Sequence, residues 1–176
     1  MRKTIGLLMC IFVVMTVGNV AAQDYDHTAK VDDMSFSWKI IDKALQVKLT
    51  GESTGWVAIG FNPTSQMKDA NFVIGYVKNG KTTIEDDFGH EERAHKMDED
   101  LGGKNDVTVI GGEEKGKTTT IEFSIPLDSG DKYDSVIDPN GETVILLAYG
   151  GSRDSFRSKH KFRKTIKVNL ATGKVL

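Results

Sequence analysis

Apolar and polar residues alternate along several short stretches of this chain, and a period of two predicts β-strands rather than helices. Residues 45–49 (LQVKL), 34–40 (MSFSWKI) and 164–170 (KTIKVNL) all show this alternation. Residues 142–149 (ETVILLAY) form the most apolar segment, which predicts a central strand of a sheet. The pattern therefore favours a chain built from short β-strands.

Two further apolar stretches, Gly55–Phe61 and Asn71–Val77, enclose a polar loop. Nearly every position in them is apolar, as in strands that are buried on both faces. Asn79-Gly80 follows the second stretch and is the strongest hairpin signal in the chain. Residues 107–110 and 118–125 flank a turn rich in Gly and Glu, and they predict another hairpin.

No segment shows a sustained helical period. Residues 88–100 are the only candidate, but they are dense in charge and poor in apolar positions, so we expect a loop with at most one helical turn. They belong to a long polar stretch, residues 86–106, and loops of that length are often functional. About eight to ten short strands separated by turn signals predict an all-β protein with the architecture of a β-sandwich.

The beginning of the chain has the pattern of a secretory signal peptide. A basic pair is followed by an apolar run over residues 5–17 and by small residues at Ala21-Ala22. The apolar run is short for a membrane span, which needs about 20 residues. We therefore expect residues 1–22 to be removed on export, and residues 23–176 to form one domain without a membrane span. A retained N-terminal anchor is the alternative.

Composition and charge argue against several classes of function. Removal of Arg2 and Lys3 with the leader changes the formal net charge from −2 to −4, which argues against a nucleic-acid partner. The only cysteine, Cys10, also lies in the leader, so the mature chain has no disulfide, thiolate metal site or covalent haem attachment. No G-x-S-x-G motif or Gly-rich phosphate loop occurs either, so no catalytic set is evident and we do not expect an enzyme.

Two charged clusters are weak candidates for metal sites. His90 and His95 resemble a zinc protease motif, but they are five residues apart and would lie about 140° apart on a helix. The acidic residues nearby lack the spacing of a calcium-binding EF-hand loop. We expect both clusters to be solvated, and weak adventitious metal binding is the alternative for the histidine cluster. The acidic residues are Glu85, Asp86, Asp87, Asp98, Glu99 and Asp100.

Met67 is a methionine in the polar loop between the two apolar stretches, and His160 precedes the last long strand. Both lie at strand ends, and we expect them to meet at one mouth of the sandwich. A thioether and an imidazole together form a common axial pair for haem iron. The residues alone leave open that Met67 is exposed or packs back onto the core, and that His160 is simply an exposed histidine.

Five segments occur along the chain in this order: residues 55–63 (GWVAIGFNP), 70–76 (ANFVIGY), 84–87 (IEDD), 119–126 (TTIEFSIP) and 147–150 (LAYG). Together they resemble the DOMON domain family. The resemblance covers about residues 30–170, and it implies an immunoglobulin-like antiparallel β-sandwich. The H-x-x-R pattern at His160–Arg163 resembles the start of the last strand in many bacterial members.

The resemblance also implies a cofactor. Haem-binding members of the family hold iron through a Met after the first matching strand and a His near the last strand, and Met67 and His160 occupy these positions. This implies noncovalent haem b with a six-coordinate iron, which transfers single electrons rather than activating oxygen. Some related subunits use a Lys as the second ligand, so Lys159 is the alternative to His160, although a lysine must first lose its proton.

A haem would need an apolar slot and cationic partners for its propionates. Strand alternation puts Trp56 and Phe61 on opposite faces, so not every nearby aromatic can line one slot. The candidates for the slot are Trp56, Phe61, Phe72 and Tyr76. The candidates for the propionates are Arg153, Arg157, Lys159 and Arg163.

Two other functions stay open at this point. Other members of the family act as ligand-binding or interaction modules. This chain could bind a sugar or another small ligand without iron, or contact a partner protein through residues 86–106. For the haem-binding form, the expected partner is a redox protein such as a membrane cytochrome or a dehydrogenase. The expected compartment is the periplasm or the extracellular space, and the match to bacterial members favours the periplasm.

Overall fold

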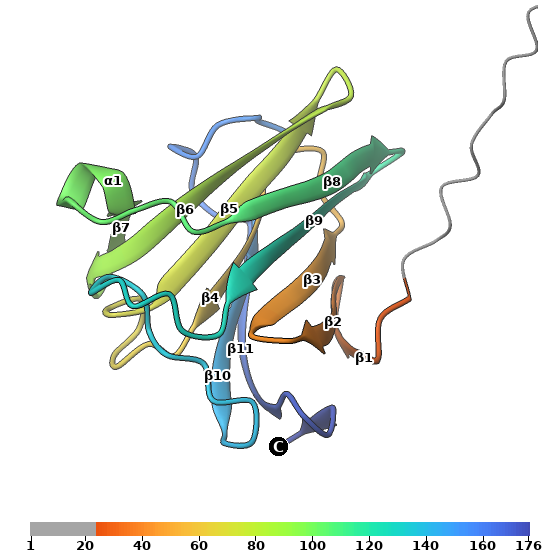
Figure 1. Cartoon of the computed structure of the whole chain (residues 1–176). Helices are drawn as coiled ribbons and strands as arrows, with labels where there is room; N and C mark the ends of the chain where they lie inside the picture. Colours follow the sequence, from red (N-terminus) through yellow and green to blue (C-terminus); the bar gives the residue numbers. More distant parts are fainter. Residues whose placement is uncertain (1–23) are drawn as a thin grey trace, which may run out of the picture.

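The computed structural model describes residues 24–176, and the expected signal peptide, residues 1–22, lies outside the described residues. The described chain forms two antiparallel sheets that pack face to face (Figure 1). The prediction of an all-β, immunoglobulin-like β-sandwich is therefore confirmed. Residues 24–176 contain twelve strands, somewhat more than the eight to ten expected.

One sheet has five strands in the order β1-β2-β3-β9-β8. Inward side chains alternate with more exposed ones along β2, as the sequence pattern predicts, and its Phe36 and Trp38 are fully buried. The strands are β1 (His27–Val31), β2 (Met34–Ile41), β3 (Ala44–Gly51), β9 (Thr118–Pro126) and β8 (Thr108–Lys115).

The other sheet has seven strands in the order β12-β11-β10-β4-β5-β6-β7. Its strand β4 is buried at every position, and the turn between β5 and β6 has Asn79 and Gly80 at positive φ, as the hairpin signal predicts. The strands are β12 (Lys174–Val175), β11 (Phe162–Asn169), β10 (Thr143–Tyr149), β4 (Val57–Phe61), β5 (Asn71–Lys78), β6 (Lys81–Glu91) and β7 (Ala94–Met97).

The hydrophobic core lies between the two sheets. Each large side chain that leaves water here contributes about 1.5–3 kcal/mol to the stability of the fold. The Trp38 indole also donates a buried 2.9 Å hydrogen bond to the carbonyl of Leu170, which ties the C-terminal segment to the five-stranded sheet. The largest fully buried side chains are Trp38, Phe36, Phe61, Phe123, Leu45, Leu49, Ile59, Ile121, Ile137, Ile145, Leu147 and Leu170.

The expectation of a loop over residues 88–100 is wrong for most of that stretch. Strand β6 continues to Glu91, the chain turns, and β7 pairs with it before one helical turn, α1 (Asp98–Leu101). Strand β7 is the edge of its sheet, where charged side chains are common, so it lacks the apolar alternation that identifies strands in a sequence. Among residues 24–176, no helix is long and apolar enough to cross a membrane.

Candidate functional site

Small side chains line the middle of the seven-stranded sheet on the face that points away from the core, which we call the outer face. Val57, Ile59 and Phe61 of β4 belong to the core, so alternation places Ala58 and Gly60 on the outer face. Across the sheet, Ala148 of β10 pairs with Ala58. The two central strands therefore present a narrow strip with little side-chain volume.

Aromatic and aliphatic side chains border this strip. Trp56, Ala58 and Ile74 form an apolar cluster that is separate from the core, and Tyr76 and Phe156 pack against it. The rings of Tyr76 and Phe156 have centroids 4.9 Å apart. The outer face is therefore apolar over β4 and β5, which is unusual for the exposed side of a sheet.

Three of the four aromatic residues predicted for a slot lie on this face. Phe72 covers Gly60 closely, since a Cβ added at Gly60 would lie 2.4 Å from its ring. Trp56 and Tyr76 belong to the outer apolar cluster. Phe61 is fully buried in the core between the sheets, so the structure does not bring it to the same face.

Met67 lies half-buried in a loop that is held by backbone hydrogen bonds. Its N–H donates to the carbonyl of Glu92, at 3.2 Å, and its own carbonyl accepts from the N–H of Ala70, at 3.2 Å. The N–H of Asp69 donates to the carbonyl of Gly89 at 2.7 Å. The loop is thus attached to the β6–β7 hairpin, and Met67 has a defined position rather than a free one.

Gly89 is what allows this attachment. A Cβ added there would lie 1.7 Å from the carbonyl oxygen of Met67, a separation that no side chain can adopt. The missing side chain lets the backbones of β6 and of the Met67 loop touch.

The segment that carries His160 is anchored to the opposite end of the same face. The Trp56 indole donates a 2.8 Å hydrogen bond to the hydroxyl of Ser158, and the N–H of Lys161 donates to the carbonyl of Tyr149 at 2.8 Å. His160 itself is exposed. Its predicted cationic neighbours Arg153, Arg157, Lys159 and Arg163 are exposed as well.

The expectation that Met67 and His160 share one mouth of the sandwich is wrong. The Met67 loop follows Phe61, whereas His160 precedes Phe162, which pairs with Tyr149 opposite Val57 at the start of β4. Val57 and Phe61, the two ends of β4, are four residue steps apart, which is about 13 Å along the strand. Figure 1 shows the blue segment before β11 and the yellow loop after β4 at opposite ends of the sheet. The two side chains therefore flank the apolar outer face.

A second imidazole lies beside this face. His95 of β7 contacts the carboxylate of Asp87 through Nδ1, and its ring lies 5.6 Å from that of Phe72. A carboxylate that holds one nitrogen of a histidine is typical of metal-binding histidines. His90 and His95 lie on strands of one hairpin rather than on a helix, so the zinc protease arrangement is absent from these residues. The sequence contains no signal that places His95 near Phe72.

The expectation of a solvated acidic cluster is correct for part of it only. Glu99 and Asp100 are exposed, whereas Asp86, Asp87 and Asp98 are buried. These buried carboxyl groups have no signal in the sequence beyond their charge.

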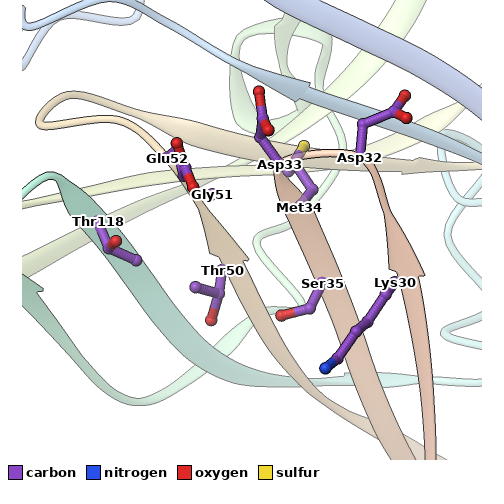
Figure 2. Close-up of a pocket in the computed structure, with 9 residues that line it drawn as sticks. All are labelled: Lys30, Asp32, Asp33, Met34, Ser35, Thr50, Gly51, Glu52 and Thr118. Atoms are coloured by element: carbon purple, nitrogen blue, oxygen red, sulfur yellow. The ribbon is translucent and has the colours of Figure 1, made fainter.

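One surface pocket lies away from this face. It has a volume of about 260 Å³ and lies at one end of β2 and β3, lined by side chains such as Lys30, Asp32 and Glu52 (Figure 2). It contains none of the predicted site residues, and its exposed lining is about equally polar and apolar. We therefore place the candidate site on the outer face.

Comparisons with known proteins agree with this architecture. The family model for the DOMON domain matches residues 27–150. The chain is 25% identical over 126 residues to MOXD1 homolog 2 of Drosophila melanogaster and 26% identical over 133 residues to human DBH-like monooxygenase protein 1. These matches cover 71% and 74% of this chain but only 16% and 21% of the relatives, so the chain spans about a fifth of their length.

Two solved cytochrome domains share the fold. The cytochrome b domain of pyranose dehydrogenase from Coprinopsis cinerea superposes with a TM-score of 0.61 and 13% identity, over 81% of this chain and 79% of that domain. The cytochrome domain of Myriococcum thermophilum cellobiose dehydrogenase gives a TM-score of 0.56 and 9% identity, over 76% and 73% of the two chains. At such identities the likeness establishes the fold alone.

Proposed function

This chain belongs to the DOMON domain family, and from that premise we propose that it is an exported electron-transfer domain that binds one haem b noncovalently. Met67 and His160 are the proposed axial ligands of the iron. Residues 23–176 would form one non-catalytic domain. Its electron transfer would depend on a separate redox partner. Two relatives of known structure with the same fold are cytochrome domains, which supports this choice.

The observation that carries the proposal is the apolar outer face with a candidate ligand at each end. Ala58, Gly60 and Ala148 contribute little side-chain volume at the centre of the sheet. Met67 and His160 would hold the iron, because the Met67 loop and the His160 segment approach this face from opposite ends.

The residues present suit haem in chemical type. A thioether and an imidazole would leave the iron no open position, so the bound group would supply one-electron transfer. The apolar cluster of Trp56, Ile74 and Tyr76 would exclude water from it. The Phe72 ring, which covers Gly60, has to turn aside before any flat group can reach the strip.

The surrounding residues would orient the ligands and the propionates. Ser158 holds the His160 segment through its hydrogen bond with Trp56, and the hairpin contacts of Gly89 hold the Met67 loop. Arg163 pairs with Ala148 across β10 and β11, so of the four cationic candidates it is placed on the outer face by strand register.

Ligand variants test the assignment. Purified protein is reconstituted with haem, and the absorption spectra of Met67→Ala and His160→Ala are compared with the wild type. Each substitution should abolish the six-coordinate spectrum and weaken haem binding. Lys159→Ala and His95→Ala are the matched controls, since both residues are alternative nitrogen donors near the face, and they should keep the wild-type spectrum. A spectrum unchanged in both Met67→Ala and His160→Ala would refute the ligand pair.

A module without iron is the second candidate. The monooxygenase relatives favour it, because the matched region makes up only 16% and 21% of their length. Such a module would bind a sugar or another small ligand on the outer face, or contact a partner protein. It predicts colourless protein after haem supply and a ligand-dependent rise in melting temperature.

We also propose the setting in which the domain works. Export to the periplasm or the extracellular space follows from the leader pattern of residues 1–22. A redox protein, such as a membrane cytochrome or a dehydrogenase, would exchange electrons with the haem.

A further inference from the structure

Three carboxylates from separate segments meet near one end of the seven-stranded sheet. Asp86 belongs to β6, Asp98 begins α1, and Asp134 lies in the loop between β9 and β10. One carboxylate oxygen from each lies within 4.8 Å of the other two. In Figure 1 the cyan loop after β9 turns back beside this end of β6. The fold, rather than the sequence order, brings these acids together.

Several of their oxygens are buried without a hydrogen-bond donor. Asp98 is completely buried, and no described residue donates to either of its carboxylate oxygens. Asp86 is 3% exposed; its Oδ2 accepts a 2.7 Å hydrogen bond from the N–H of Asp106, but its Oδ1 has no donor. The Oδ2 of Asp106 is also buried and without a donor. Natural proteins rarely leave buried carboxylate oxygens unsatisfied.

No ion pair compensates these charges among residues 24–176. The ion pairs of the described chain involve other carboxylates, such as Asp100 with Lys96 and Asp87 with His95. Burial raises the pKa of Asp98 to about 8 and that of Asp86 to about 7, and neighbouring carboxylates add to both shifts. A group of buried like charges is stable only with protons or with a cation.

We propose that Asp86, Asp98 and Asp134 bind a calcium ion. The converging ligand atoms are all carboxylate oxygens, which suit a hard cation, and no sulfur or imidazole belongs to the cluster. The acids come from a strand, a helical turn and a loop, an irregular set that suits the flexible coordination of Ca²⁺ better than the strict octahedron of Mg²⁺. This site does not depend on haem binding.

Neighbouring contacts position the third acid for this role. Asp134 accepts 2.5 Å hydrogen bonds from Asn71 and from Ser129, one on each carboxylate oxygen. The hydroxyl of Tyr133 donates to the carbonyl of Leu101 at 2.8 Å, which holds the loop against α1. A bound ion would therefore join β6, α1 and the β9–β10 loop, and through Asn71 the start of β5, four residues after Met67.

Thermal unfolding of haem-free protein provides the first test. After treatment with EDTA and removal of the chelator, calcium at about 100 times its Kd should raise Tm by about 5–10 °C. Magnesium at the same concentration should raise it less. An unchanged Tm in calcium, or an equal response to magnesium, would overturn the calcium assignment. Because the protein is haem-free, this result is separate from that of the haem experiment.

Variants and a direct probe complete the test. Asp98→Asn and Asp86→Asn should each lower calcium affinity by at least about tenfold. Asp100→Asn is the matched control, because Asp100 is exposed on the same helical turn and should leave the response unchanged. Terbium luminescence sensitised by Tyr133 gives a readout on the wild type that needs no variant. Luminescence that calcium displaces supports the site, whereas its absence, or an Asp98→Asn response equal to the wild type, refutes it.

Discussion

Gly89→Ala is the substitution that most directly tests how the Met67 loop is held. The new Cβ would lie 1.7 Å from the carbonyl oxygen and 2.7 Å from the carbonyl carbon of Met67. Both are backbone atoms, so no side-chain rotation can relieve the overlap. The loop and β6 must move apart by more than an ångström to restore an ordinary contact of about 3 Å or more.

The energetic cost follows from the hydrogen bonds that such a movement breaks. Three backbone hydrogen bonds join the loop to the hairpin: Asp69 N–H to Gly89 O at 2.7 Å, Gly89 N–H to Ala70 O at 2.9 Å, and Met67 N–H to Glu92 O at 3.2 Å. Each contributes about 0.5–1.5 kcal/mol net. Alanine restricts the unfolded chain more than glycine does, which stabilises the folded state by about 0.4–1 kcal/mol. We therefore expect a net loss of about 1–4 kcal/mol.

Urea unfolding measures this loss, and the haem spectrum measures its consequence for Met67. Gly111→Ala is the control, since no atom lies within 4 Å of a Cβ added there. Gly89→Ala should lower the unfolding midpoint and, in haem-loaded protein, shift the spectrum toward that of Met67→Ala. If Gly89→Ala matches Gly111→Ala in both measurements, the account of the loop is incorrect.

Two further predictions concern Ser158 beside the outer face and the buried acids Asp86 and Asp98. Ser158→Ala leaves the buried Trp56 indole N–H without its 2.8 Å acceptor, so urea unfolding should show a loss of about 1–3 kcal/mol, whereas an unchanged midpoint would contradict that bond. In calcium-free protein, burial raises the pKa of Asp86 and Asp98 from 3.8 to about 7 and about 8, so their stabilising contribution is full below about pH 4 and is lost as pH rises through those values. Tm should fall between about pH 4 and pH 8 without calcium, and a flat profile would contradict the shifts.

The sequence predicts the strands well where one face is apolar and the other polar. Residues 45–49 fall inside β3, and residues 164–170 overlap β11. The Asn79-Gly80 turn joins β5 to β6 with both residues at positive φ. Strand β7 is missed because an edge strand needs only one neighbour and keeps its charged side chains. Its pairing with β6 comes from the backbone rather than from a hydrophobic pattern.

The site is harder to predict because it depends on which strands are neighbours. Alternation alone separates Phe61 from Trp56, as the structure bears out, yet it does not say which face each occupies. The register of β4 and β10 decides that Met67 and His160 approach from opposite ends. The convergence of Asp98 with Asp134 likewise depends on a loop folding back over α1, for which charge and spacing contain no signal.

Noncovalent binding of one haem is tested by an optical spectrum of the wild-type protein supplied with haem. We expect a Soret band at a ratio of one haem per chain, and a reversible one-electron change between the oxidised and reduced spectra. Colourless protein after haem supply, with calcium present to complete the fold, would contradict the claim and favour a ligand-binding module without iron.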